Sequence, residues 1–184
     1  MRYFLGFLAA IGLIVLVFIL VLRGFSGGKQ PANKAVLTDY ASTETVMQLT
    51  LDGPVNADQN HERVRISVGR TINTIEIMKG YENKVVDSRI YPNNEEAYGN
   101  FLRSLQLLGY TKGNADPKLA DERGVCPLAQ RYVYEIVSGD ATVQRFWNGS
   151  CGGGTFGGNA NNVRALFKQQ IPDYSQLTRK LSVN

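Results

Sequence analysis

One apolar run at the start of the chain constrains everything that follows it. Tyr3 to Leu22 form 20 consecutive residues without a charge. As a helix with a rise of about 1.5 Å per residue, this run would reach about 30 Å, the thickness of the hydrocarbon core of a bilayer. The residues after it have the composition of a soluble protein. We therefore predict a transmembrane anchor over residues 1–23 that holds a globular domain at a membrane.

A cleavable signal peptide and a buried core helix are the alternatives. Signal peptides usually have an apolar region of about 7–15 residues followed by a small-x-small cleavage site. This run is longer, and Gly24-Phe25-Ser26 matches such a site poorly. A core helix of a soluble protein usually keeps a polar face, whereas residues 4–22 are apolar on all sides. The pattern favours an uncleaved anchor.

The signals for the side of the membrane disagree. Arg23, Lys29 and Lys34 follow the run, and the positive-inside rule would therefore keep the domain in the cytoplasm. Long hydrophilic domains, however, are translocated largely regardless of flanking charge. The chain also has two cysteines placed to form a disulfide, which needs an oxidising compartment. We predict a domain outside the cytoplasm, and a cytoplasmic regulator is the alternative.

Charge and composition limit the partners and mark the domain. Beyond the anchor the chain carries 18 basic and 16 acidic residues, spread without a basic cluster, and this pattern does not favour nucleic-acid binding. Residues 24–42 are rich in glycine and polar residues and predict a flexible tether. We expect one domain over 43–175 and a tail over 176–184. Nothing in the sequence indicates an oligomeric state.

The pattern of the domain predicts an α+β fold. Arg63 to Val68 alternates, with the apolar residues on one side and the arginines and serine on the other, as in a half-buried strand. Similar segments separated by short turns predict a four-stranded antiparallel meander, followed by a hairpin around Gly139. Two helices should pack on one face of this sheet. The expected strands are 45–51, 63–68, 72–78, 84–91, 131–137 and 142–147, and the expected helices 93–108 and 161–170.

Local signals place the ends of the first helix. Asn93 can cap its N-terminus, with Glu96 as the capping-box partner three residues later. Gly109 stands where a glycine commonly ends a helix in the left-handed conformation.

The two cysteines flank the predicted hairpin. If Ser138-Gly139 is its two-residue turn, Cys126 lies opposite Cys151; with Gly139-Asp140 as the turn, the two cysteines are diagonal neighbours. Both registers predict a Cys126–Cys151 disulfide. A metal site or a catalytic thiol are the rival interpretations. Two cysteines and the single histidine, His61, cannot fill a structural zinc site, and His61 lies in a polar loop where we expect it on the surface.

A glycine-rich stretch joins the hairpin to the second helix. Gly152, Gly154 and Gly157 match the G-x-G-x-x-G spacing of dinucleotide sites, but the required βαβ unit is missing. The glycines can serve only to turn the backbone, or their N–H groups can bind a carboxylate or phosphate. The candidate binding residues are Gly152, Gly153, Gly154, Thr155 and Phe156.

Aromatic and acidic residues offer weaker hints. In the first hairpin register, with Ser138-Gly139 as the turn, Tyr132, Tyr134 and Trp147 share one face, and Val133 and Phe146 share the other. No pair of carboxylates is placed across a cleft, so the sequence predicts no catalytic residues, metal or cofactor. The acids that qualify by type alone are Glu95, Glu96, Asp116, Asp121 and Glu122.

The C-terminal third resembles uncharacterised bacterial proteins that have a single-pass anchor and a small exported domain. The resemblance is carried by Cys126-Pro127, residues 131–135, residues 155–158 and residues 170–174. It implies an exported, anchored domain and brings no activity.

The function expected from the sequence is binding without catalysis. We predict a membrane-tethered module that contacts a protein or a cell-envelope component, with Thr155, Phe156 and the long loop 111–125 as candidate contacts. An envelope hydrolase with an unrecognised site and a tethered enzyme inhibitor are the alternatives.

Overall fold

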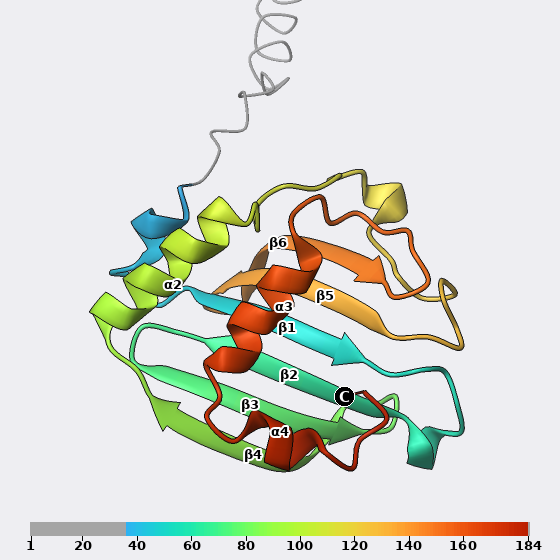
Figure 1. Cartoon of the computed structure of the whole chain (residues 1–184). Coiled ribbons are helices and arrows are strands. Elements are labelled where there is room, and N and C mark those ends of the chain that lie inside the picture. Colours follow the sequence, from blue (N-terminus) through green and yellow to red (C-terminus); the bar gives the residue numbers. More distant parts are fainter. Residues whose placement is uncertain (1–35, 184) are drawn as a thin grey trace, which may run out of the picture. The chain divides into compact units, whose positions relative to one another are not determined.

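The computed structural model describes residues 36–183 (Figure 1). The predicted anchor and most of the predicted tether lie outside the described residues. Among the residues described, no helix combines the length and hydropathy that a bilayer crossing requires. The strands are β1 (Val46–Asp52), β2 (Glu62–Val68), β3 (Ile72–Lys79), β4 (Lys84–Pro92), β5 (Arg131–Ser138) and β6 (Ala141–Gly149), and the helices are η1 (Leu37–Tyr40), η2 (Asp58–Asn60), α2 (Glu95–Leu107), η3 (Pro117–Leu119), α3 (Ala160–Gln169) and α4 (Tyr174–Thr178).

All six strands belong to one antiparallel sheet with the order β4-β3-β2-β1-β5-β6. The meander β1 to β4 has the predicted connectivity, and the α+β class is confirmed. The predicted hairpin belongs to the same sheet, because β5 pairs along the whole of β1, from Val46 opposite Val137 to Asp52 opposite Arg131. Strand β1 is therefore one of the two central strands of the sheet, with neighbours from both halves of the sequence.

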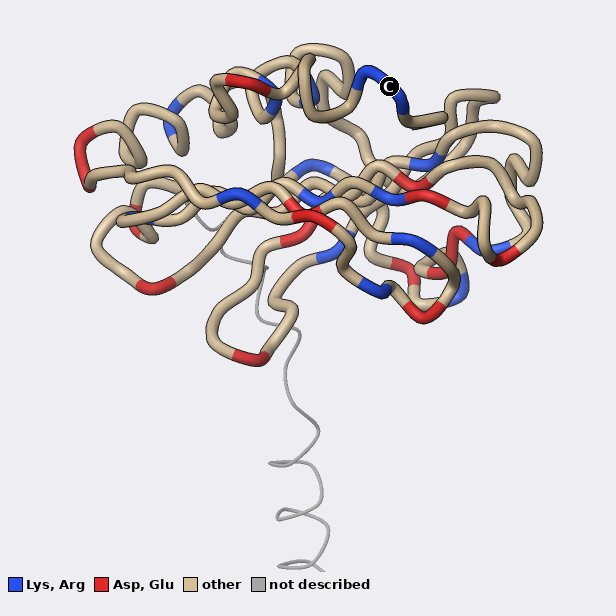
Figure 2. The backbone as a smooth tube through the Cα atoms, turned by 90° about the horizontal axis from the view of Figure 1, so that it is seen from below, with Lys and Arg blue, Asp and Glu red and all other residues tan. Residues whose placement is uncertain are grey.

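Helices α2, α3 and α4 cover one face of this sheet, and the other face is free of them (Figures 1 and 2). The alternating pattern of the strands directs Met47, Leu49 and Leu51 of β1 toward the helices, where all three are buried. Helix α2 contributes Leu102 and Leu105 to the same core, and α3 contributes Phe167. Below, the helix-free side is called the open face.

The first long helix starts one residue later than the sequence predicts. Asn94 is its N-cap, and the side chain of Asn94 accepts a hydrogen bond from the N–H of Ala97. Asn93 instead donates its side-chain amide to the carbonyl of Gly69, 2.7 Å away, and so fixes the turn between β2 and β3. At the other end Gly109 adopts φ 76°, as the sequence predicts for a glycine that ends a helix.

The packed region extends beyond the predicted 43–175 at both ends. Leu37 is fully buried, and its N–H donates to Oε1 of Gln106 in α2. At the C-terminal end α4 forms, and Val183 is fully buried beside the end of β1. Burial of apolar side chains explains both extensions, because Leu37 and Val183 add to the same core.

A β-bulge in the β5–β6 hairpin places side chains of β6 on the opposite face from the one that the sequence predicts. Gly139 and Asp140 form the turn, and the register then shifts by one residue between Ile136 and Val137. Val143 is the extra residue, so every side chain of β6 beyond it changes face. Tyr134 therefore shares the covered face with Phe146, whereas Trp147 lies opposite Val133 on the open face. The prediction that Trp147 shares a face with Tyr132 and Tyr134 was wrong.

Tyrosines occupy the centre of the core. Tyr98 donates to the carbonyl of Thr45, and Tyr110 donates to the carbonyls of Gln48 and Glu135. Burial raises the pKa of both phenols, and it raises the pKa of Tyr134 and of Tyr174 to about 12. The folded state therefore retains protons that an unfolded chain would lose near pH 10.

This retention predicts a loss of stability in alkali. Between about pH 10 and pH 12 the unfolded chain binds fewer protons than the folded domain, so the free energy of unfolding must fall as the pH rises. We expect tyrosinate absorbance of the buried tyrosines to rise in one cooperative step together with loss of the far-ultraviolet circular dichroism. Smooth ionisation near pH 10 with unchanged dichroism would contradict this prediction.

Candidate functional site

The glycine-rich stretch packs against the edge of β6. The N–H groups of Thr155 and Phe156 both donate to the carbonyl of Trp147, at 2.8 and 3.0 Å. Thr155 is buried, and the ring of Phe156 stacks on Tyr134 with 4.0 Å between centroids. These two predicted contact residues therefore make their observed contacts within the domain itself.

Three more N–H groups of the segment before α3 are already paired with backbone carbonyls. Gly152 donates to Gly149, Gly157 donates to Lys112, and Asn159 donates to Leu108. The side chain of Asn159 caps α3 by accepting from the N–H of Asn162. A backbone donor already paired with a carbonyl has nothing left for a ligand. Gly152, Gly153 and Gly154 all have positive φ, so the structural role of the glycines is supported.

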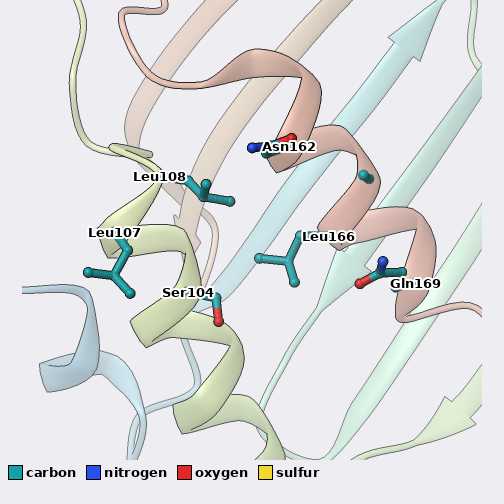
Figure 3. A pocket seen from close by; sticks show the side chains of 7 residues that line it. Ser104, Leu107, Leu108, Asn162, Leu166 and Gln169 are labelled. Atoms are coloured by element: carbon teal, nitrogen blue, oxygen red, sulfur yellow. The ribbon is translucent and has the colours of Figure 1, made fainter.

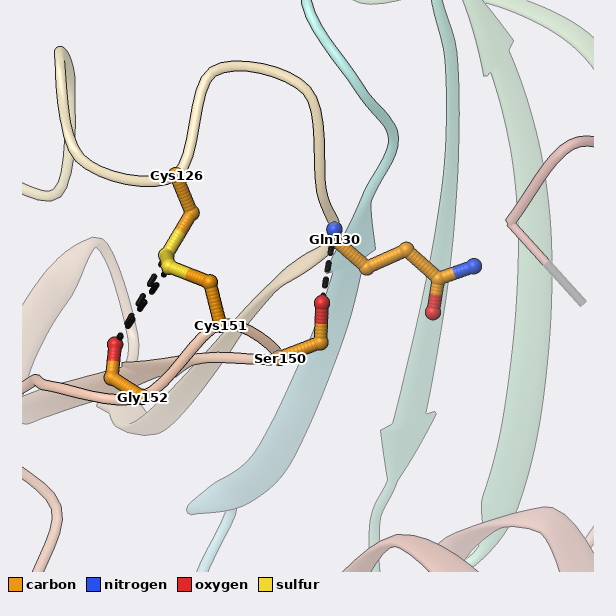
Figure 4. The surroundings of a disulfide bond; sticks show 5 residues. All are labelled: Cys126, Gln130, Ser150, Cys151 and Gly152. Carbon is orange, nitrogen blue, oxygen red and sulfur yellow. Dashed lines mark hydrogen bonds between the residues drawn. A yellow bond between two sulfur atoms is a disulfide. The ribbon is translucent and has the colours of Figure 1, made fainter.

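The predicted disulfide joins Cys126 to Cys151, with 5.9 Å between the Cα atoms (Figure 4). Of the two predicted turns, Gly139-Asp140 is the observed one, but beyond the bulge Arg131 pairs with Gly149 and the pairing ends at Gln130 and Ser150, so neither predicted register holds at the cysteines. Cys126 reaches its partner because the chain turns after it, with the N–H of Ala129 donating to the carbonyl of Cys126. The bond ties the end of the long loop to the end of β6.

That loop wraps onto the open face of the sheet. Between α2 and β5 the chain passes the edge of β6, and the indole Nε1 of Trp147 donates to the carbonyl of Leu119 at 2.8 Å. Glu122 then lies 2.5 Å from the guanidinium of Arg145, which also lies 3.3 Å from Glu135. The loop that the sequence singles out over 111–125 therefore places one carboxylate over the sheet.

A buried ionic cluster lies at the end of β1 on the open face. Asp52 pairs in register with Arg63 of β2 on one side and Arg131 of β5 on the other. Its carboxylate lies 2.6 Å from Nε of Arg63 and 2.7 Å from Nη2 of Arg131. The side chains of Asp52 and Arg131 are only 5% and 4% exposed. We call Asp52, Arg63 and Arg131 the Asp52 cluster.

His61 is fully buried beside this cluster, against the expectation of a surface position. Its Nε2 lies 2.9 Å from Asp52, its Nδ1 lies 3.2 Å from the carbonyl of Pro54, and its ring stacks on Tyr81. Both ring nitrogens therefore face oxygen acceptors inside the protein. The ring is closed off from solvent, and neither cysteine is free to pair with it.

A pocket of about 160 Å³ opens beside the Asp52 cluster. Three acidic and three arginine side chains surround it, so its charges balance. Its lining is Thr50, Asp52, Arg63, Arg65, Glu122, Val133, Glu135 and Arg145. These residues come from four strands and the loop. Charged residues of both signs lie along the sheet and in the loops on the side away from the helices (Figure 2).

Arg65 is the least engaged cation of this pocket. Its one ion pair is to Glu76, at 3.6 Å, and its Nε is buried without a hydrogen-bond partner. The carboxylates around it are each held by a closer arginine: Asp52 by Arg63, and Glu122 and Glu135 by Arg145. A guanidinium with spare donors is suited to bind a carboxylate from outside.

The other acids named by type are dispersed. Glu95 and Glu96 lie in the first turn of α2, where carboxylates offset the helix dipole. Asp116 caps η3. Hydrogen bonds from Arg123 lower the pKa of the exposed Asp121 to about 2. Within residues 36–183 no three His, Cys, Asp or Glu side chains converge as ligands for a metal ion.

A second hollow, of about 340 Å³, lies between α2 and α3 (Figure 3). Leu107, Leu108 and Leu166 give it an apolar floor, and its polar residues are Ser104, Asn162 and Gln169. Its lining has no charged side chain, so it offers no group for acid–base chemistry. The pocket on the open face is the better candidate site.

Comparison with known proteins adds nothing to this assignment. No protein-family model matches the chain, and no curated protein matches its sequence.

The Asp52 cluster predicts a large loss of stability in Asp52→Asn. The change leaves Arg63 and the buried Arg131 without their counter-charge, and breaking such a pair usually costs about 3–5 kcal/mol. Denaturant unfolding should show this loss. Asp121→Asn is the matched control, because its exposed pair with Arg123 is screened by water, and its unfolding midpoint should not move. Equal midpoints for the two variants would contradict the prediction.

Proposed function

We propose that the protein is a membrane-tethered, extracytoplasmic binding module that contacts a protein or a cell-envelope component through the open face of its sheet. The observation that carries the proposal is the pocket beside the Asp52 cluster. It combines fixed charges of both signs with one guanidinium, that of Arg65, whose donors are not used up. Such a surface suits a partner that presents a carboxylate.

The rigidity of the pocket supports binding. The sheet fixes Arg63, Arg65 and Arg145, and the disulfide holds the end of the loop that brings Glu122 to them. A site whose side chains are already held in place loses little conformational entropy when a partner binds. The same disulfide, together with the apolar run from Tyr3 to Leu22, supports a site outside the cytoplasm.

The alternative of an envelope hydrolase has one observation in its favour. His61 and Asp52 lie 2.9 Å apart, and Asp52 lines the pocket. A general base, however, needs a nitrogen that can reach the proton it removes. Because both nitrogens of the buried His61 face Asp52 and Pro54, this pair is better explained as structural support for the cluster.

The state of the cysteines in living cells tests the proposed compartment. We expect the exported chain to show no reaction with a bulky maleimide until it is denatured and reduced, and then to gain two labels for Cys126 and Cys151. A reporter fused after residue 184 should be active only outside the cytoplasm. Two free thiols in untreated cells, or a reporter active only inside, would refute the proposed location.

Photo-crosslinking in native membranes tests the binding face. A photoreactive residue in place of Ser67, on the open face of β2, should capture a partner, whereas the same residue in place of the exposed Leu107 on α2 should not. Arg65→Gln in the Ser67 probe should lower the yield at least about tenfold, as expected when a charge-assisted contact is lost. Arg103→Gln on the exposed surface of α2 is the matched control and should leave the yield unchanged.

The two probes show which surface of the domain binds the partner. Capture through Leu107 alone would move the binding surface to the helices. Capture through Ser67 that does not depend on Arg65 would refute the role of the pocket.

A further inference from the structure

The two edges of the sheet differ in how they are covered. At β6, the carbonyl of Trp147 is taken by the N–H groups of Thr155 and Phe156, and Asn148 forms a bridge with Gly154. At β4, the sheet ends, and no described segment forms a strand beyond it. An uncovered edge presents unpaired N–H and C=O groups to any extended chain that fits it.

The uncovered edge also exposes apolar side chains. Val85, Val86 and Ile90 are 46%, 49% and 67% exposed. Between them, Arg89 pairs with Asp87 at 2.8 Å and donates to the carbonyl of Ser88 at 3.1 Å. Charges on an edge usually hinder pairing with other strands, so the order in which these charges follow one another decides what the edge can accept.

That order is symmetric about Ser88. Asp87 and Arg89 lie one residue on either side of it, and Val86 and Ile90 lie two residues on either side. We propose that a second copy of this chain pairs antiparallel with β4 about a two-fold axis at Ser88. Asp87 then lies opposite Arg89 of the second copy, and Val86 lies opposite Ile90, each pair occurring twice.

The faces of the strand agree with this pairing. Ile90 and Ser88 lie opposite Thr74 and Glu76 of β3, so they point to the open face, and Asp87 and Arg89 point to the side of the helices. In the pair of strands, apolar side chains therefore lie next to each other on the open face, and the opposite charges of Asp87 and Arg89 lie next to each other on the covered face. Cross-strand neighbours of both kinds stabilise a sheet.

Charge also selects this register over its neighbours. An axis at Asp87 would place that carboxylate opposite its own copy, and an axis at Arg89 would do the same with the guanidinium. Like charges directly opposite each other destabilise a strand pair. Val86 is the extra residue of a bulge, where the register of β3 and β4 shifts, so the regular part of β4 that can hold this register begins at Asp87.

The symmetric pair has a defined geometry that does not rest on the proposed binding function. A two-fold axis perpendicular to the sheet keeps the helices of both copies on one side. The twelve strands form one sheet, and the two open faces, each with its pocket, look in the same direction.

Cysteine trapping in the full chain tests the pairing. Directly opposed residues of antiparallel strands have Cα atoms about 4.5–5.5 Å apart, which falls in the range that a disulfide bridges. In membranes treated with a mild oxidant, Ser88→Cys should give a covalent homodimer on non-reducing gels. Val143→Cys is the matched control, because Val143 is also exposed and lies on the edge strand at the other end of the sheet, and it should stay monomeric.

Charge exchange tests the register. In the Ser88→Cys chain, Asp87→Arg or Arg89→Asp alone should lower the yield of dimer at least about tenfold, since each places like charges opposite each other. Both changes together restore opposite charges and should return the yield to within about twofold of the original. Circular dichroism and thermal unfolding should be alike in all these variants, because the pair is exposed within one copy.

Three results would overturn the proposal. The first is a dimer yield from Ser88→Cys no higher than from Val143→Cys. The second is a yield that does not respond to the single charge reversals or is not restored by the exchange. The third is a mixed disulfide of Ser88→Cys with a different protein in place of the homodimer, which would assign the edge to another partner.

Discussion

The whole fold depends on a sheet that is covered by helices on one side only. On the covered side, burial of apolar side chains is sufficient, and the strands, α2 and α3 share one core. On the open side, polar and charged residues also become buried, and they need hydrogen bonds or counter-charges there. There Asp52, with an arginine on each neighbouring strand, forms a compact ionic cluster, and the long loop covers the part of the sheet nearest β6. The proposed site lies between the ionic cluster and the long loop, and residues of both line it.

Local features of the fold could be predicted from sequence, and long-range ones could not. Alternation in residues such as Arg63 to Val68 reports a strand and its two faces, because the period of two is a local property. The glycine cap at Gly109 and the Cys126–Cys151 bond follow from equally local signals. Pairing of β1 with β5 joins segments about 85 residues apart, and no spacing in the sequence encodes it. Without that pairing, Asp52 and Arg131 cannot be brought together.

Two errors have particular physical causes. The bulge at Val143 shifts the hairpin by one residue, and a shift of one residue exchanges the faces of everything that follows, including Trp147. His61 stands among polar residues, which predicts exposure, but Asp52 at the end of β1 and Tyr81 in the turn between β3 and β4 pack against it. The pocket was missed for the same reason, since its residues come from β1, β2, β5, β6 and the loop.

Trp147 is the single tryptophan of the chain. It is buried on the open face, and its indole donates to Leu119 in the loop that wraps around β6. Its fluorescence therefore arises at the junction of the loop and the sheet. Displacement of Leu119 from the indole would expose the ring to water, and its emission would shift to longer wavelength. The chain thus contains an intrinsic optical reporter of the position of the loop on the sheet, which requires no label.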